Sequence, residues 1–156
     1  MKSGLMKIAL VYRFKPFLAV LGWSASTAAL AVATIFQGLL LPKVYGSGGG
    51  FLDEVVNQNP LGLWIFYLGN FGICVLAAIV ISDLGTSIIG FFVSYMGAAV
   101  ITYMVLALPD FLGVYPIQGV LSGSAVTFAF TAFFPLLLLV NLVGTFVGVG
   151  LGERLS

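Results

Sequence analysis

The chain contains no histidine, one cysteine and few charged residues, since Asp, Glu, Lys and Arg make up only 7% of its 156 residues. A soluble domain has about 25% charged residues. The absence of histidine removes the commonest general base and the commonest metal and haem ligand. The single cysteine, Cys74, cannot form an internal disulfide, and it lies in an apolar run where a free thiol behaves as a small hydrophobe.

Hydrophobic residues take the place of the missing charges. They make up 61% of the chain, and the mean hydropathy is +1.19. Too little polar surface remains to cover a water-soluble globule, so we expect membrane lipid to be the solvent for most of the chain. We expect residues 1–156 to form a single membrane domain, and the net charge of +1 offers no basic face for nucleic acid.

Four apolar runs are long enough to cross a bilayer, which takes about 20 residues. None of them contains Lys, Arg, Asp or Glu. Backbone polar groups in lipid must be bonded within the segment, so each run is predicted to be a helix. The predicted fold is all-α, a polytopic integral membrane protein with four transmembrane helices. The expected spans are about 17–41, 61–82, 87–108 and 125–151.

The first sixteen residues mix basic and apolar side chains. Lys2, Lys7, Arg13 and Lys15 alternate there with residues such as Leu5 and Ile8. This composition predicts a basic interfacial segment over residues 1–16, with its cations near anionic head groups. The apolar run that follows has about 25 residues, longer than the core of a signal peptide at about 7–15, so we expect a retained helix.

The distribution of cations predicts the orientation in the membrane. With four spans both termini lie on one side, and that side holds five of the six Lys and Arg residues, while Lys43 lies on the other. Basic residues stay in the cytoplasm. We therefore expect cytoplasmic N- and C-termini in a multi-pass protein of the cell membrane, with loops 42–60 and 109–124 outside.

Short segments between the spans carry further signals. Asp83 and Thr86 lie in a tight cytoplasmic turn and are residue types that cap helix N-termini. Residues 51–60, "FLDEVVNQNP", are expected to form a short interfacial helix that ends before Pro60.

The second outer loop, 109–124, is mostly apolar, unlike a loop in water. We expect it to pack on the bundle, to dip into the membrane as a re-entrant segment, or to contact a partner. The candidate contact residues in it are Pro116, Gln118, Gly119 and Ser122.

No pattern of catalytic residues is present. Ser122, in "LSGSA", resembles the glycine-flanked serine of intramembrane serine proteases, but that serine needs a histidine to take its proton. None of the five carboxylates lies deep in a span, which excludes the paired aspartates of an intramembrane aspartyl protease. Phosphate-loop, CxxC and HExxH motifs are also missing. We therefore expect no enzyme activity, no metal site and no cofactor.

Small residues recur at four-residue spacing in three of the spans. In lipid no hydrophobic force drives helices together, so their association depends on close packing. Stripes of small residues allow that packing because they let helix backbones approach closely. Three flat faces exceed what four helices need for their own fold, so some are expected to contact other membrane protein subunits or copies of this chain. The three stripes are Ala25, Ala29 and Ala33; Gly90, Ser94 and Ala98; and Gly144, Gly148 and Gly152.

Three carboxamides fall inside the spans: Gln37, Asn70 and Asn141. We expect Asn70 to bond to a facing helix, with Asn141 or Thr102 as its partner, because a carboxamide in lipid needs donors and acceptors. No ionisable group lies at the midplane, which argues against an ion-coupled carrier. The leading hypothesis is a non-enzymatic subunit of a membrane complex or homo-oligomer. The alternative is a small permease or channel component whose polar path these residues line.

The stretch "DEVVNQNPLGLWIFYLGNFGICVLAAIVISDLGTSIIGFFVSYMGAAV", followed by "YPIQGVLSGSA", resembles the stage II sporulation protein M family and its archaeal members. That family has Asn or Asn-Asn at the place of Asn70 and a glycine near Gly85. This chain lacks the family's loop His and Glu between Pro116 and Gly123 and has one Asn at position 70. The resemblance implies a multispan protein that acts through partners, in spore formers a septal complex that localises cell-wall hydrolases.

Overall fold

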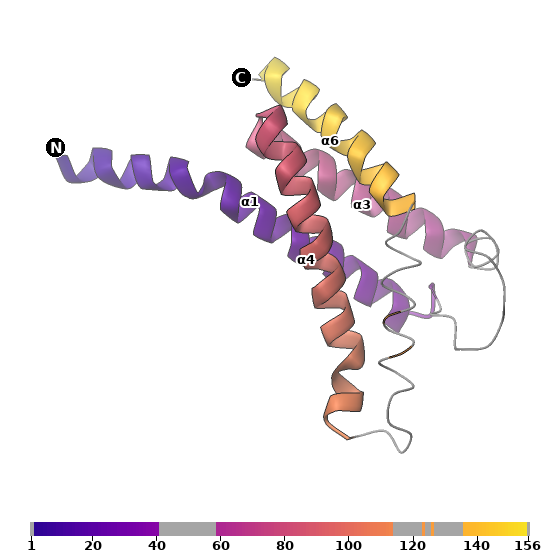
Figure 1. Ribbon diagram of the computed structural model, residues 1–156. Coiled ribbons are helices and arrows are strands. Elements are labelled where there is room, and N and C mark those ends of the chain that lie inside the picture. Colours follow the sequence, from indigo (N-terminus) through magenta and orange to yellow (C-terminus); the bar gives the residue numbers. More distant parts are fainter. Residues whose placement is uncertain (1, 41–58, 114–122, 124–125, 127–135, 156) are drawn as a thin grey trace.

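The computed structural model describes residues 2–40, 59–113, 123, 126 and 136–155, with side chains from Phe14 onward. In this part of the chain it contains four long helices (Figure 1): α1 (Lys2–Phe36), α3 (Pro60–Ile81), α4 (Leu84–Phe111) and α6 (Leu136–Leu155). Each is long and apolar enough to cross a membrane. The structure is that of an all-helical polytopic membrane protein, as the hydropathy predicted.

The helix bounds differ from the predicted spans at several ends. The first membrane-length segment is Phe14–Phe36, and it stops short of residue 41 because the chain turns at Gly38, whose φ is +68°. Helix α4 continues through Pro109 to Phe111, past the predicted end at 108. The start of the fourth predicted span and the short helix predicted over 51–60 lie largely outside the described residues.

Side-chain caps begin the two middle helices. Asn59 precedes Pro60, and its Oδ1 accepts a hydrogen bond from the N–H of Leu61 at 3.0 Å. Asp83 caps α4, and its Oδ2 accepts from the N–H of Thr86 at 2.7 Å. The predicted cap is therefore confirmed. Hydrogen bonds from the side chain and then the backbone of Thr86 lower the pKa of the Asp83 carboxyl below its ordinary value.

The tight turn between α3 and α4 depends on one left-handed residue. Ser82 ends α3 with φ 61°, a conformation that is unusual for a residue with a Cβ. Its hydroxyl donates to the carbonyl of Ile79 at 2.6 Å, and its N–H donates to the carbonyl of Ala78 at 2.9 Å. These two bonds satisfy carbonyls that the helix end would otherwise leave open.

The helices pair out of sequence order: α3 packs most extensively on α6, and α1 on α4. Both pairs run parallel. Along α1 and α4, Val20 lies beside Gly90 and Ser24 beside Gly97; along α3 and α6, Cys74 lies beside Gly144. The start of the packed part of α1 and the end of α6 therefore lie at the end of the bundle that holds the α3–α4 turn (Figure 1).

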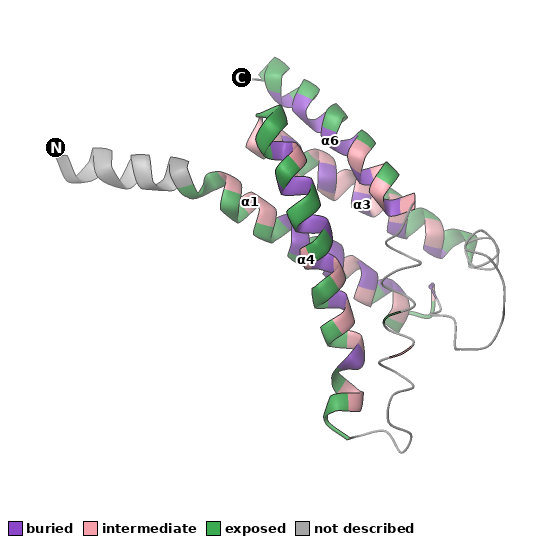
Figure 2. Cartoon of the chain, in the orientation of Figure 1, coloured by how far each residue is buried: buried purple, intermediate pink, exposed green. Residues whose placement is uncertain are grey.

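The buried stripe of α3 connects the two pairs. Its members are Gly62, Phe66, Asn70, Cys74 and Ala78. Each four-residue step turns about 40° beyond a full helical turn, so the stripe winds around the helix. At one end Gly62 lies against Leu39, after α1, and at the other Ala78 lies against Gly148 of α6. The purple positions in Figure 2 follow this line through the bundle.

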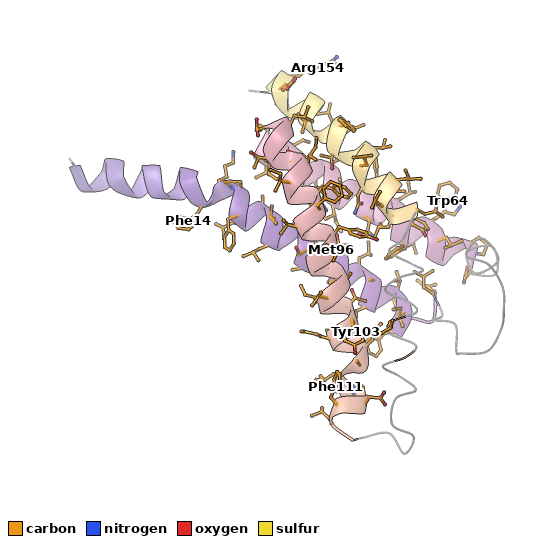
Figure 3. The ribbon with its side chains drawn as sticks, in the orientation of Figure 1. Phe14, Trp64, Met96, Tyr103, Phe111 and Arg154 are labelled. Carbon is orange, nitrogen blue, oxygen red and sulfur yellow. The ribbon has the colours of Figure 1, made fainter. Side chains whose placement is uncertain are left out.

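The outside of the bundle is covered by large apolar side chains. Trp64 is 63% exposed, Met96 59% and Phe111 68%, and in Figure 3 these side chains point away from the helices. Soluble proteins rarely expose so much contiguous apolar surface to water. A membrane protein exposes such a surface to lipid, so the exposed apolar residues agree with the membrane location indicated by helix length.

Candidate functional site

The glycine stripe of α6 forms a close contact with α3. Gly144, Gly148 and Gly152 are all buried and face α3. A Cβ built on Gly148 would lie 2.6 Å from both the Cβ of Ala78 and the carbonyl oxygen of Val75. On the opposite side of α6, Gly150 is exposed, and a Cβ there would meet nothing within 4 Å. This stripe therefore serves the fold of the chain itself.

The stripe of α4 is also used inside the chain. Gly90, Ser94 and Ala98 are buried. A Cβ on Gly90 would lie 3.0 Å from Cγ2 of Val20, and the Ser94 hydroxyl donates to the backbone carbonyl of Val20 at 3.2 Å. The small side chains bring α4 close enough to α1 for a side chain to bond its backbone.

The stripe of α1 lies on the opposite side of its helix from the bundle. Ala25, Ala29 and Ala33 are all exposed, so the described part of the chain does not use them for its own packing. The inward face instead carries Trp23, whose ring centroid lies 6.4 Å from that of Phe91, together with hydroxyl-bearing and small residues. The buried residues of this inward face are Trp23, Ser24, Thr27, Ala28, Ala31 and Thr34.

The exposed stripe is wider than the sequence analysis recognised. Gly22 and Ser26 are also exposed, and positions 22, 26, 29 and 33 follow the alternating four- and three-residue spacing of one helix face. A Cβ on Gly22 would meet nothing within 4 Å. We call this set the α1 small-residue face, and it consists of Gly22, Ala25, Ser26, Ala29 and Ala33. Spacing alone was the signal that would have added Gly22 and Ser26.

Among the described residues no hydrogen bond joins the three carboxamides to one another. Asn70 is fully buried, and its Nδ2 donates to the carbonyl of Phe66 in its own helix at 2.7 Å. Among the described residues its Oδ1 has no partner, so the bond expected to Asn141 or Thr102 is not formed. Asn141 is buried on α6, whereas Gln37 follows the end of α1 and is exposed.

Cys74 makes the cross-helix bond that was expected of Asn70. Its thiol donates to the backbone carbonyl of Asn141 at 2.9 Å and lies 3.4 Å from Oγ1 of Thr145. The Thr145 hydroxyl donates to the same carbonyl at 2.8 Å. Sequence reasoning treated Cys74 only as a small hydrophobe and missed this link between α3 and α6. Its position one turn after Asn70, in the same four-residue series, was the available signal.

An apolar groove of about 400 Å³ runs between α3 and α6 at the end away from the α3–α4 turn. Of its lining residues only Tyr67 and Trp64 have any polar side-chain atom, and no carboxamide is among them. The groove is therefore unsuited to be a polar path. Its lining residues are Pro60, Leu63, Trp64, Tyr67, Leu136 and Val140.

The predicted loop site, Pro116, Gln118, Gly119 and Ser122, lies outside the described residues. Across the part of the chain that the structure describes, no three His, Cys, Asp or Glu side chains come together in a way that could hold a metal ion.

Comparison with protein-family models, with curated proteins and with solved structures gave no match. The resemblance to the stage II sporulation protein M family therefore stays a prediction.

Proposed function

We propose that this protein is a non-enzymatic integral membrane subunit that joins another transmembrane helix, from a partner subunit or a second copy, through the α1 small-residue face. The observation that carries the proposal is the exposure of this face. The other two small-residue stripes are buried within the chain, while Ala25, Ala29 and Ala33 remain open.

The physics of helix association in lipid supports this use. Lipid tails solvate an apolar helix as well as another helix does, so association depends on close packing and interhelical hydrogen bonds. The contact of Gly148 with Val75 and Ala78 shows the same device within the chain. On the α1 small-residue face, Ser26 adds a hydroxyl able to bond across a new interface.

The cation distribution gives the proposal an orientation. The end of the bundle with the α3–α4 turn holds the N-terminal extension of α1 and Arg154, and basic residues remain cytoplasmic. We therefore assign both termini to the cytoplasm and the protein to the cell membrane. A role through partners also agrees with the resemblance to the sporulation family.

The permease alternative has less support. A polar path needs side chains that converge on one accessible space. Asn70 is fully buried and bonded within α3, Gln37 is exposed beyond the end of α1, and the groove beside α6 is apolar.

The test is the size and protein content of particles extracted gently from the native membrane. We expect a particle larger than one chain, and we expect Ala29→Leu to dissociate it because the leucine side chain holds the backbones apart. The matched control is Gly150→Leu, which places the same bulk on an exposed face of α6 where a Cβ meets nothing within 4 Å. Particles of unchanged mass with Ala29→Leu, or a wild-type particle of one chain, would refute the proposal.

A further inference from the structure

Helix α1 is much longer than its packed part. It runs for 35 residues from Lys2 to Phe36, but its contact with α4 begins at Val20, which lies against Gly90 and Ser94. Before that point Phe14 is 49% exposed, Phe17 58% and Leu18 61%. Figure 1 shows the N-terminal half of α1 leaving the other three helices, and in Figure 3 Phe14 points away from the bundle. We call residues 2–15 the α1 extension.

Positive charge is concentrated in the α1 extension. Lys2, Lys7, Arg13 and Lys15 are four of the six cations of the chain, and the first acidic residue is Asp53. Four cations and no acid give the extension a charge of +4. The acidic side chains at this end of the bundle, Asp83 and Glu153, belong to the start of α4 and the end of α6, and Asp83 accepts hydrogen bonds from Thr86.

We propose that the α1 extension binds the anionic phospholipid head groups of the leaflet it adjoins. Arg13 and Lys15 lie within about one helical turn of Phe17 in the uncharged run that follows them, so they are within about one screening length, roughly 10 Å, of the head groups. Apolar residues such as Leu5, Ile8 and Leu10 stand between the cations. That mixture suits the boundary between head groups and acyl chains better than it suits a nucleic acid or an acidic protein in water.

Pro16 supplies the place where the helix can change direction. It lies inside α1 and has no N–H, so the carbonyl of Tyr12 loses its helical hydrogen bond and the ring pushes against that turn. A helix bends most readily at such a point. The extension can therefore lie along the leaflet while Phe17 and the residues after it cross the membrane.

The test uses the full chain with a nitroxide spin label at Ser3→Cys. Cys74 is fully buried, and a Cys74→Ser background removes any labelling there. The labelled protein is placed in vesicles of phosphatidylcholine alone or of phosphatidylcholine with phosphatidylglycerol, and the accessibility of the label to a water-soluble relaxation agent is measured. We expect the label to be shielded in the anionic vesicles and released by high salt, since each cation near the surface strengthens binding roughly fivefold.

Two sequence changes sharpen the result. Replacing all four cations by glutamine should leave the label equally accessible in both vesicles, whereas replacing Lys2, Lys7 and Lys15 by arginine should preserve the shielding. Arg154→Gln, at the other end of the chain, is the control. Because lipid charge and salt can be varied on the unchanged extension, misfolding of the glutamine variant does not weaken the test. A label whose accessibility is independent of lipid charge and salt would overturn the proposal.

Discussion

The contact of Gly148 with α3 allows a sharp prediction about stability. In Gly148→Ala the new methyl group would lie 2.6 Å from the Val75 carbonyl oxygen and from the Cβ of Ala78, and 3.1 Å from the Val75 Cα. These are two backbone atoms and a Cβ, none of which can rotate away. The two helices must therefore separate locally, and the neighbouring contact of Cys74 with Asn141 loosens with them.

The magnitude follows from a comparison with Gly150→Ala. Alanine favours a helix by about 1 kcal/mol over glycine at either position. This contribution from helix propensity therefore cancels when the two variants are compared. Overpacking a close contact costs about 1–3 kcal/mol. At Gly150 the methyl group enters open space. We expect the free energy of unfolding of Gly148→Ala to be lower than that of Gly150→Ala by about 1–3 kcal/mol.

The assay is reversible unfolding in mixed micelles, followed by the loss of helicity as denaturing detergent is added. Both variants should retain four helices before the transition, and Gly148→Leu should fail to reach the folded baseline. Equal midpoints for Gly148→Ala and Gly150→Ala would refute the register of α3 against α6 described above.

Further predictions concern polar groups. Cys74→Ala should lower the free energy of unfolding by about 1–2 kcal/mol in the same assay through loss of the bond to Asn141 and of packing, while Cys74→Ser keeps the bond. Asn70→Leu should leave that free energy within about 1 kcal/mol of wild type, because it removes an unpartnered buried oxygen; a larger loss would reveal a cross-helix bond. Asp83→Ala should speed amide exchange at Thr86, measured by mass spectrometry. Because the folded pKa of Asp83 is lowered, its stabilisation is present above the unfolded pKa and disappears as pH falls through the folded one, a pH dependence that Asp83→Asn should abolish.

Hydropathy and capping chemistry made part of the fold predictable. Runs without charge predict spans because an ionised group in lipid is costly wherever the run lies in the fold. The cap at Asp83 was predictable because it depends only on the next three residues. Both signals are local, and both agree with the structure.

Other features depend on which helices pair, and this cannot be predicted from the spacing of residues in the sequence. The stripes at Ala25 and at Gly144 look alike in sequence, yet the first is exposed and the second is buried against Cys74. A small-residue stripe indicates that another helix can approach closely. Which helix does so depends on how the helices pair in the fold. The same applies to Asn70, which donates one of its two N–H groups to the Phe66 carbonyl of its own helix and not to a facing helix.

The out-of-order pairing of α1 with α4 has a consequence for biosynthesis. A chain is made from its N-terminus, so α1 enters the bilayer two spans before its main neighbour exists. During that interval two of its three buried hydroxyls need no second helix, because Ser24 donates to the Val20 carbonyl at 3.0 Å and Thr34 to the Leu30 carbonyl at 2.9 Å. The third, Thr27, has no hydrogen-bond partner among the described residues. Ser24 and Thr34 thus each enter the membrane with an acceptor from their own helix. Most of the hydroxyl groups on the inward face of α1 can therefore remain bonded in lipid until α4 is inserted and packs on them.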